Sequence, residues 1–133
     1  MKVYVFGNRD YEKDKLSFDV VDKLDLKNLK IEFEEVKPNQ DLPFTGSEMV
    51  VMMDVVMGID KVKLITEDDL DKLVLPPRSS AHDYDLGFQL KYLLKLGKLK
   101  KIRIIGLPMS GKVNYDSIHS ILRKLVAQDI QGS

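Results

Sequence analysis

The sequence contains no cysteine and no tryptophan, and only two of its 133 residues are histidine. Without cysteine the chain cannot form a disulfide, bind a metal through thiolates or use a cysteine nucleophile. Its 21 Lys and Arg residues are balanced by 21 Asp and Glu residues, so it lacks the basic excess of a duplex-binding domain, and nucleic acid is not the expected partner. The longest apolar run, residues 49–53, is far shorter than the ~20 residues that cross a bilayer.

Length and composition are those of one folded domain. A chain of 133 residues and 15.2 kDa has the usual size of a single domain, and its 44% of apolar residues can supply a core. We therefore expect a single α/β domain over residues 1–133. The sequence does not begin with the basic residues and long apolar stretch of a secretory signal peptide, so we expect a cytoplasmic protein with no membrane partner.

Hydrophobic periodicity predicts a chain in which strands alternate with helices. The expected strands are residues 2–6, 29–36, 49–56, 61–66 and 101–106, and the expected helices are residues 14–26, 67–73, 86–96 and 118–125. This order favours a three-layer α/β sandwich: a mostly parallel five-stranded sheet with helices on both faces. Because only a turn separates residues 56 and 61, too few for a parallel crossover, we expect the fourth strand to run antiparallel to its neighbour.

Two strands have patterns that predict their places in the sheet. Residues 49–56 (MVVMMDVV) are almost wholly apolar, which predicts a strand buried on both faces in the middle of the sheet. Residues 29–36 alternate apolar and acidic side chains, which is typical of an edge strand.

We interpret four methionines as core residues and a basic group as a solvated helix end that complements the helix dipole. These are Met49, Met52, Met53 and Met57, and Lys95, Lys98, Lys100, Lys101 and Arg103.

Three polar residues are expected beyond the carboxyl ends of the strands, where open α/β sheets bind ligands. Asp14 opens the first helix, Asp54 closes the apolar strand, and His82 lies in the loop before the helix that begins near residue 86. Two carboxylates and an imidazole suit a divalent transition metal such as nickel, zinc, manganese or cobalt. A set of three ligands also leaves coordination positions open for a substrate. The spacing matches no local metal motif, but the topology permits the three residues to meet.

Each of these residues also has a structural alternative. Asp14 can be an acid that the dipole favours at a helix N-terminus. Asp54 can cap its strand, although a lone buried carboxylate costs free energy unless it is paired. His82 can be a loop histidine that is hydrogen-bonded to Asp83 or Asp85, and Asp85 is also a candidate N-cap of the following helix.

A second motif predicts different chemistry. Residues 106–112 (GLPMSGK) fit the pattern G-x-x-x-x-G-K of a phosphate-binding loop between a strand and a helix. However, Val113 stands where the motif has the hydroxyl that holds Mg²⁺, and Pro108 removes one backbone N–H from the loop. A nucleotide-binding module built on Gly106 to Lys112 is therefore the remotest of the functions considered.

The chain resembles the hydrogenase maturation endopeptidases, which trim the large subunit of nickel–iron hydrogenases. Four segments carry the resemblance, in the right order and over nearly the whole chain. They are a strand ending in Gly7-Asn8 with an acid six residues beyond, Asp14; an apolar strand ending in Asp54; a stretch with Ser80, His82, Asp83 and Gly87 that leads into a helix; and the strand Ile104-Ile105-Gly106-Leu107-Pro108.

The resemblance implies a function and a set of site residues. The three metal-binding positions of the family fall on Asp14, Asp54 and His82, and the first two carboxylates are the expected catalytic residues. Gly7 and Asn8 would shape the adjoining loop, and Asp83 would orient His82. Such a protein would recognise nickel held by the hydrogenase large-subunit precursor and then remove a C-terminal extension. The alternative is a catalytically inactive metal-recognition or interaction protein of the same fold.

Overall fold

The computed structural model describes residues 1–6, 16–24, 29–36, 49–72, 86–109 and 113–132. The strands are β1 (Lys2–Phe6), β2 (Glu32–Val36), β3 (Met49–Val56), β4 (Lys63–Thr66) and β5 (Lys101–Pro108), and the helices are α1 (Leu16–Lys23), the 3₁₀ helix η1 (Glu67–Lys72), α2 (Leu86–Lys95) and α3 (Tyr115–Gly132). The strands form one sheet in the order β2-β1-β3-β5-β4. All neighbours pair in parallel except β4 and β5, which confirms the predicted α/β class.

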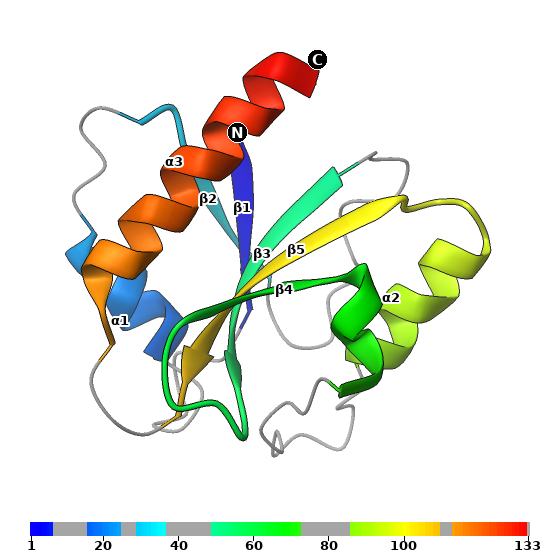
Figure 1. Cartoon of the computed structure of the whole chain (residues 1–133), viewed down its shortest axis with the longest axis horizontal. Helices are drawn as coiled ribbons and strands as arrows, with labels where there is room; N and C mark the ends of the chain where they lie inside the picture. Colours follow the sequence, from blue (N-terminus) through cyan, green and yellow to red (C-terminus); the bar gives the residue numbers. More distant parts are fainter. Residues whose placement is uncertain (7–15, 25–28, 37–48, 73–85, 110–112, 133) are drawn as a thin grey trace.

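The helices cover both faces of the sheet (Figure 1). Val20 of α1 and Ile118, Leu122 and Leu125 of α3 share one core cluster with Val51, Met53 and Val55 of β3. Leu70 of η1 and Leu90 of α2 share the other cluster with Val50, Met52 and Val56. Alternate side chains of β3 therefore enter opposite cores, as the pleat of a strand requires. No helix in the described part of the chain is long and apolar enough to cross a lipid bilayer.

The two strand positions predicted from sequence are confirmed. The strand β3 lies in the middle of the sheet, pairs in parallel with β1 and β5, and buries every residue after Met49. The acidic strand β2 lies at one edge, where Lys2 of β1 approaches Glu34 with an Nζ–Oε1 distance of 3.6 Å. Burial on both faces thus explains the continuous apolar run of β3, and an exposed edge explains the alternation in β2.

The antiparallel strand has a different partner from the one its sequence position suggests. β4 is antiparallel as predicted, but it pairs with β5, and β5 lies between β3 and β4. The six residues 57–62 that separate the two strands form no tight hairpin and leave the width of one strand free. The last strand of the chain fills that place and is buried by neighbours on both sides.

Other predictions from sequence also need correction. β2 begins at Glu32 and not at residue 29, and β4 begins at Lys63 and not at residue 61. β5 continues to Pro108, two residues beyond its expected end, because its last residues pair with β3 as far as Val56. α3 continues to Gly132 although the apolar stripe ends at Leu125. Met57 is 38% exposed and is not a core residue, whereas Met52 and Met53 are fully buried.

Gly97 ends α2 as the sequence predicts. Its φ is +73°, its N–H donates to the carbonyl of Leu94 at 3.1 Å, and the N–H of Lys98 donates to the carbonyl of Leu93 at 2.9 Å. These two bonds are the pair that defines a Schellman motif, which favours glycine at the left-handed position.

We expect Gly97→Ala to lower the free energy of unfolding by about 1 kcal/mol, because an added Cβ is strained at positive φ. Apart from Gly97 itself and its two neighbours in the chain, no atom lies within 4 Å of the position that this Cβ would take, so the cost is conformational and not steric. Urea denaturation measures the loss. Gly97→Asn is the control and should lose less, because asparagine tolerates this conformation. Equal losses in both variants would contradict the explanation.

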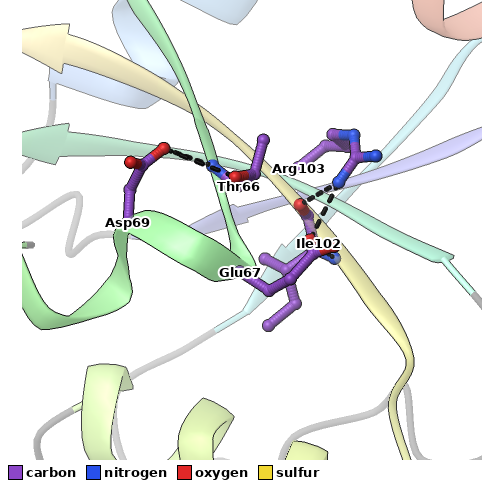
Figure 2. Close-up of polar contacts among 5 residues, drawn as sticks. All are labelled: Thr66, Glu67, Asp69, Ile102 and Arg103. Carbon is purple, nitrogen blue, oxygen red and sulfur yellow. Dashed lines mark hydrogen bonds and ion pairs between the residues drawn. The ribbon is translucent and has the colours of Figure 1, made fainter.

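A network of polar side chains joins η1 to the sheet (Figure 2). Asp69 Oδ2 accepts hydrogen bonds from the N–H and the hydroxyl of Thr66, at 3.3 and 3.4 Å, which caps η1. Glu67 Oε2 accepts from the N–H of Ile102 at 3.0 Å and from Arg103 Nη1 at 2.9 Å. The Glu67 carboxylate thus binds a backbone donor of β5 next to the end of the β4–β5 pairing. Arg103 belongs to this network and not to a solvated helix end.

We expect Glu67→Gln to lower the free energy of unfolding by about 1 kcal/mol at pH 7, because the negative charge that strengthens the hydrogen bonds from Ile102 and Arg103 is lost. Partial burial raises the pKa of Glu67. The N–H groups of Ile102 and Glu67 and the Arg103 guanidinium together lower this pKa by more than burial raises it, so it lies below its ordinary value of 4.5. A depressed folded-state pKa stabilises the protein above pH 4.5, and that stabilisation is lost as the pH falls through the folded-state pKa.

Denaturation of wild type and Glu67→Gln at pH 7 and at about pH 3 tests this. The difference between the two proteins should shrink at the lower pH, whereas exposed Asp68→Asn should have little effect at either. A difference that stays constant with pH would show that the Glu67 charge does not contribute.

Candidate active site

Asp54 is the described acid that the fold buries most deeply. It lies third from the end of β3, only 1% of it is exposed, and its Oδ1 accepts a hydrogen bond from the N–H of Val55 at 2.8 Å. The side chains of Val50, Met52 and Val56, at even positions of the strand, pack in the core on the α2 face. Asp54 shares their parity, so its carboxylate is directed to the same face of the sheet.

Asp54 also lies beside the switch point of the sheet, where the order of successive strands reverses. From β1 the chain passes through α1 to β2 on one side, whereas β3 lies on the other side of β1. β1 and β3 are thus the strands between which the order reverses, and α1 and α2 cover opposite faces. In open α/β sheets the crevice beyond the carboxyl ends of such strands is the usual ligand site.

Gly106 is the residue of β5 that pairs with Asp54. A Cβ added at Gly106 would lie 3.1 Å from Ile65 Cδ1, 3.1 Å from Val56 Cγ2 and 3.3 Å from the carbonyl oxygen of Lys63, so the core closes tightly over this position. Residues 106–108 belong to a buried strand and not to a loop. This contradicts the phosphate-loop hypothesis for residues 106–112, because the first three residues of the motif are paired with β3 and cannot wrap a phosphate.

Ser17 is a buried polar residue that the sequence analysis missed. It is the second residue of α1, it is fully buried, and its Oγ has no hydrogen-bond partner among the described residues. Within the described ranges, Ser17 and Asp54 are the buried polar or charged residues. A signal was present in the sequence, because Ser17 lies on the apolar helical stripe of Val20, Val21 and Leu24. Since α1 follows β1, its first turn lies toward the carboxyl ends of the parallel strands, which is the end of the sheet at which Asp54 lies.

We expect Ser17→Ala to leave the free energy of unfolding unchanged or to raise it by up to about 1 kcal/mol, because burying an unpaired hydroxyl is costly. Thermal denaturation measures the change. A loss of more than about 1 kcal/mol would show that the hydroxyl is hydrogen-bonded in solution.

Two methionines extend beyond the same edge of the sheet. Met57 follows β3 and Met109 follows β5, directly after the paired residues Val56 and Pro108. They are 38% and 41% exposed. Flexible thioether side chains form adaptable contacts with varied apolar groups. The rim near Asp54 is therefore apolar on the β3–β5 side.

The other predicted site residues lie outside the described part of the chain. Asp14, His82 and the supporting residues Gly7, Asn8 and Asp83 belong to residues 7–15 and 73–85. No group of three or more His, Cys, Asp or Glu residues that could hold a metal is present among the residues that the structure describes. The structure thus places one of the three predicted ligands, and the convergence of all three stays a prediction.

Comparison with solved structures gives the fold an experimental counterpart. The hydrogenase maturating endopeptidase HybD from E. coli superimposes with a TM-score of 0.54 at 13% sequence identity, covering 99% of this chain and 91% of HybD. A hydrogenase 2 maturation peptidase from Thaumarchaeota archaeon SCGC_AB-539-E09 gives a TM-score of 0.41 at 18% identity, covering 99% and 97% of the two chains. An E. coli endopeptidase solved in solution gives 0.46 at 11% identity, covering 96% and 89%.

The described elements define a three-layer α/β protein with a buried carboxylate at the switch point of its sheet. Its fold is that of a hydrogenase maturation endopeptidase, the class to which HybD belongs. The resemblance that four sequence segments predict is therefore confirmed for the fold. No protein-family model matches the sequence, and no curated protein matches it.

Proposed function

We propose that this protein is a cytoplasmic endopeptidase that removes a C-terminal extension from a nickel–iron hydrogenase large-subunit precursor after nickel insertion. The observation that carries the proposal is the buried Asp54 carboxylate at the carboxyl end of the central strand, in a chain that shares the HybD fold over nearly its whole length. A carboxylate is costly to bury, so its presence at a ligand-binding edge favours a functional role.

Chain connectivity supports the proposed ligand set. Asp14 lies two residues before the first residue of α1, and His82 lies four residues before the first residue of α2. At ~3.6 Å per residue, their Cα atoms lie within about 7 Å and 14 Å of those helix starts. α1 follows the parallel strand β1 and α2 leads into the parallel strand β5, so the first turns of both helices lie toward the carboxyl ends of the parallel strands, on opposite faces of the sheet. Asp14, Asp54 and His82 are therefore candidates to meet at the switch point.

The proposed donor set fits nickel carried by the substrate. Two carboxylates and one imidazole supply hard and borderline ligands, which suit divalent nickel, and no cysteine is available to favour a softer ion. The metal, when bound, would act as a recognition element and as an electrophile that polarises the scissile carbonyl. The residues of this chain would complete its coordination, so that precursor lacking nickel is not recognised. The exposed Met57 and Met109 would contact apolar side chains of the extension.

The direct test mixes the purified protein with nickel-loaded and nickel-free precursor and measures the precursor mass. The proposal predicts mass loss from the C-terminus of the nickel-loaded form alone. Binding of the loaded precursor without any loss of mass would instead assign the chain as a metal-recognition protein. Equal cleavage of both forms would contradict nickel recognition.

A further inference from the structure

The last turn of α2 and the residue that follows it expose an apolar pair far from the candidate active site. Tyr92 is 56% exposed and Leu96 is 49% exposed. They are four residues apart, and the N–H of Leu96 donates to the carbonyl of Tyr92 at 3.0 Å, so the two side chains lie on neighbouring turns of one helical face. Within the described ranges, these two are half of the large apolar side chains that are exposed.

Exposed lysines surround this pair. Lys95 is the last residue of α2 and lies between Tyr92 and Leu96 in sequence, and Lys98 is the last residue of the Schellman motif. Neither of these two lysines forms an ion pair within the described part of the chain. Residues 86–101 contain five lysines and no Asp or Glu. The helix dipole accounts for a lysine near the C-terminus of α2, but it does not account for the exposed Tyr92 and Leu96 beside it.

The fold holds this surface in a fixed shape. Leu90 and Leu99, which flank it in sequence, are 0% and 1% exposed and pack in the core on the α2 face. The Schellman bonds of Gly97 and Lys98 fix the turn between them. A preformed surface loses little conformational entropy when a partner binds, which favours affinity.

We propose that this surface, formed by Tyr92, Lys95, Leu96 and Lys98 and called the α2 surface below, binds an acidic segment of a partner protein. An apolar side chain of the segment packs against Tyr92 and Leu96, and carboxylates on either side of it approach the lysines. This arrangement has an aromatic centre and a charged rim, as in many protein interfaces. Complementary charge would steer the encounter and make it sensitive to salt.

The observations favour a protein segment over two other anionic partners. A nucleic-acid surface is expected on a basic chain, whereas this chain has no net charge. A membrane-binding helix needs a broad apolar face, whereas the α2 surface exposes two large apolar side chains.

The α2 surface is separate from the candidate active site. α2 leads to Lys101 at the amino end of β5, whereas Asp54 pairs with Gly106 five residues further along that strand. At ~3.3 Å per residue this separation is about 16 Å along the sheet. A partner at the α2 surface would leave the Asp54 edge free, so the inference goes beyond the proposed function and does not depend on it.

The test uses fluorescence anisotropy with a labelled peptide of four Glu-Glu-Leu repeats and the full-length protein. The wild type should bind, and binding should weaken as salt is added. Lys95→Glu with Lys98→Glu should weaken binding at least about tenfold. Tyr92→Ala with Leu96→Ser should weaken it about fivefold, because the central apolar contact is lost. These side chains are exposed, so the variants should fold, which circular dichroism checks.

The matched control is Lys61→Glu with Lys124→Glu, which makes the same charge change at exposed positions outside α2. It should bind the peptide within about twofold of wild type, as should Asp54→Asn. No binding by wild type, or equal weakening in the control, would overturn the proposal. So would tighter binding of single-stranded DNA or phosphatidylserine vesicles through the same residues, or α2-dependent dimers in sedimentation.

Discussion

Replacing Asp54 by asparagine should abolish precursor cleavage and leave the fold intact. The amide has the size of the carboxylate, and its oxygen can still accept the hydrogen bond that the N–H of Val55 donates at 2.8 Å. Only the negative charge is removed, and with it the ability to bind a divalent metal strongly or to take up a proton. We expect the cleavage rate to fall at least about a thousandfold.

Stability should change little. A neutral amide is cheaper to bury than a carboxylate, which offsets the weakening of the contacts that the carboxylate makes, so the melting temperature of Asp54→Asn should stay close to that of wild type. Mass spectrometry of the precursor and a thermal melt measure the two effects. Asp116→Asn, at an exposed position of α3, is the control and should cleave at the wild-type rate. Wild-type cleavage by Asp54→Asn, or its unfolding, would assign Asp54 a structural role.

Replacing His82 by alanine should abolish divalent-metal binding. The proposed site has one imidazole ligand, so its removal leaves two carboxylates that bind a divalent transition metal less strongly. Titration calorimetry with nickel chloride should show binding by wild type and none by His82→Ala. The chain has one other histidine, His119, which lies half-buried within α3, so His119→Ala is the matched control and should bind nickel as wild type does.

The pH dependence of nickel binding follows from the same chemistry. An imidazole binds metal only when neutral and a carboxylate only when ionised, so the nickel affinity of wild type should fall as the pH is lowered. Unchanged nickel affinity in His82→Ala would remove His82 from the site. Loss of affinity in His119→Ala would place the metal on α3 instead.

The sequence predicts the framework of the fold because burial leaves a pattern in residue order. β3 reads as a continuous apolar run because neighbours cover both of its faces, and β2 alternates because it lies at an edge. Gly97 identifies the end of α2 because few other residues adopt its positive φ. The order of residues does not show which strands pair when they are far apart in the sequence. The insertion of β5 between β3 and β4 depends on pairing between residues 37 to 52 positions apart, such as Thr66 with Arg103 and Met49 with Lys101.

The candidate site is predicted in part for the same reason. Asp54 interrupts an apolar run, a pattern that predicts a buried acid, and the structure confirms that burial. Met57 is exposed because it lies one position beyond the end of β3. The sequence did not predict this exposure, because methionine is usual in cores and Met57 directly follows an apolar run. Similarly, Arg103 belongs to a basic run in sequence, but its pairing with Glu67 requires β4 and β5 to lie side by side.

The meeting of Asp14, Asp54 and His82 at one metal is the central claim, and an anomalous-scattering map of crystals soaked in nickel tests it most directly. We expect a peak about 2.0–2.2 Å from oxygens of both carboxylates and from an imidazole nitrogen, at the carboxyl ends of β1 and β3. A nickel peak held by other residues, with the Asp54 carboxylate directed away from it, would contradict the account.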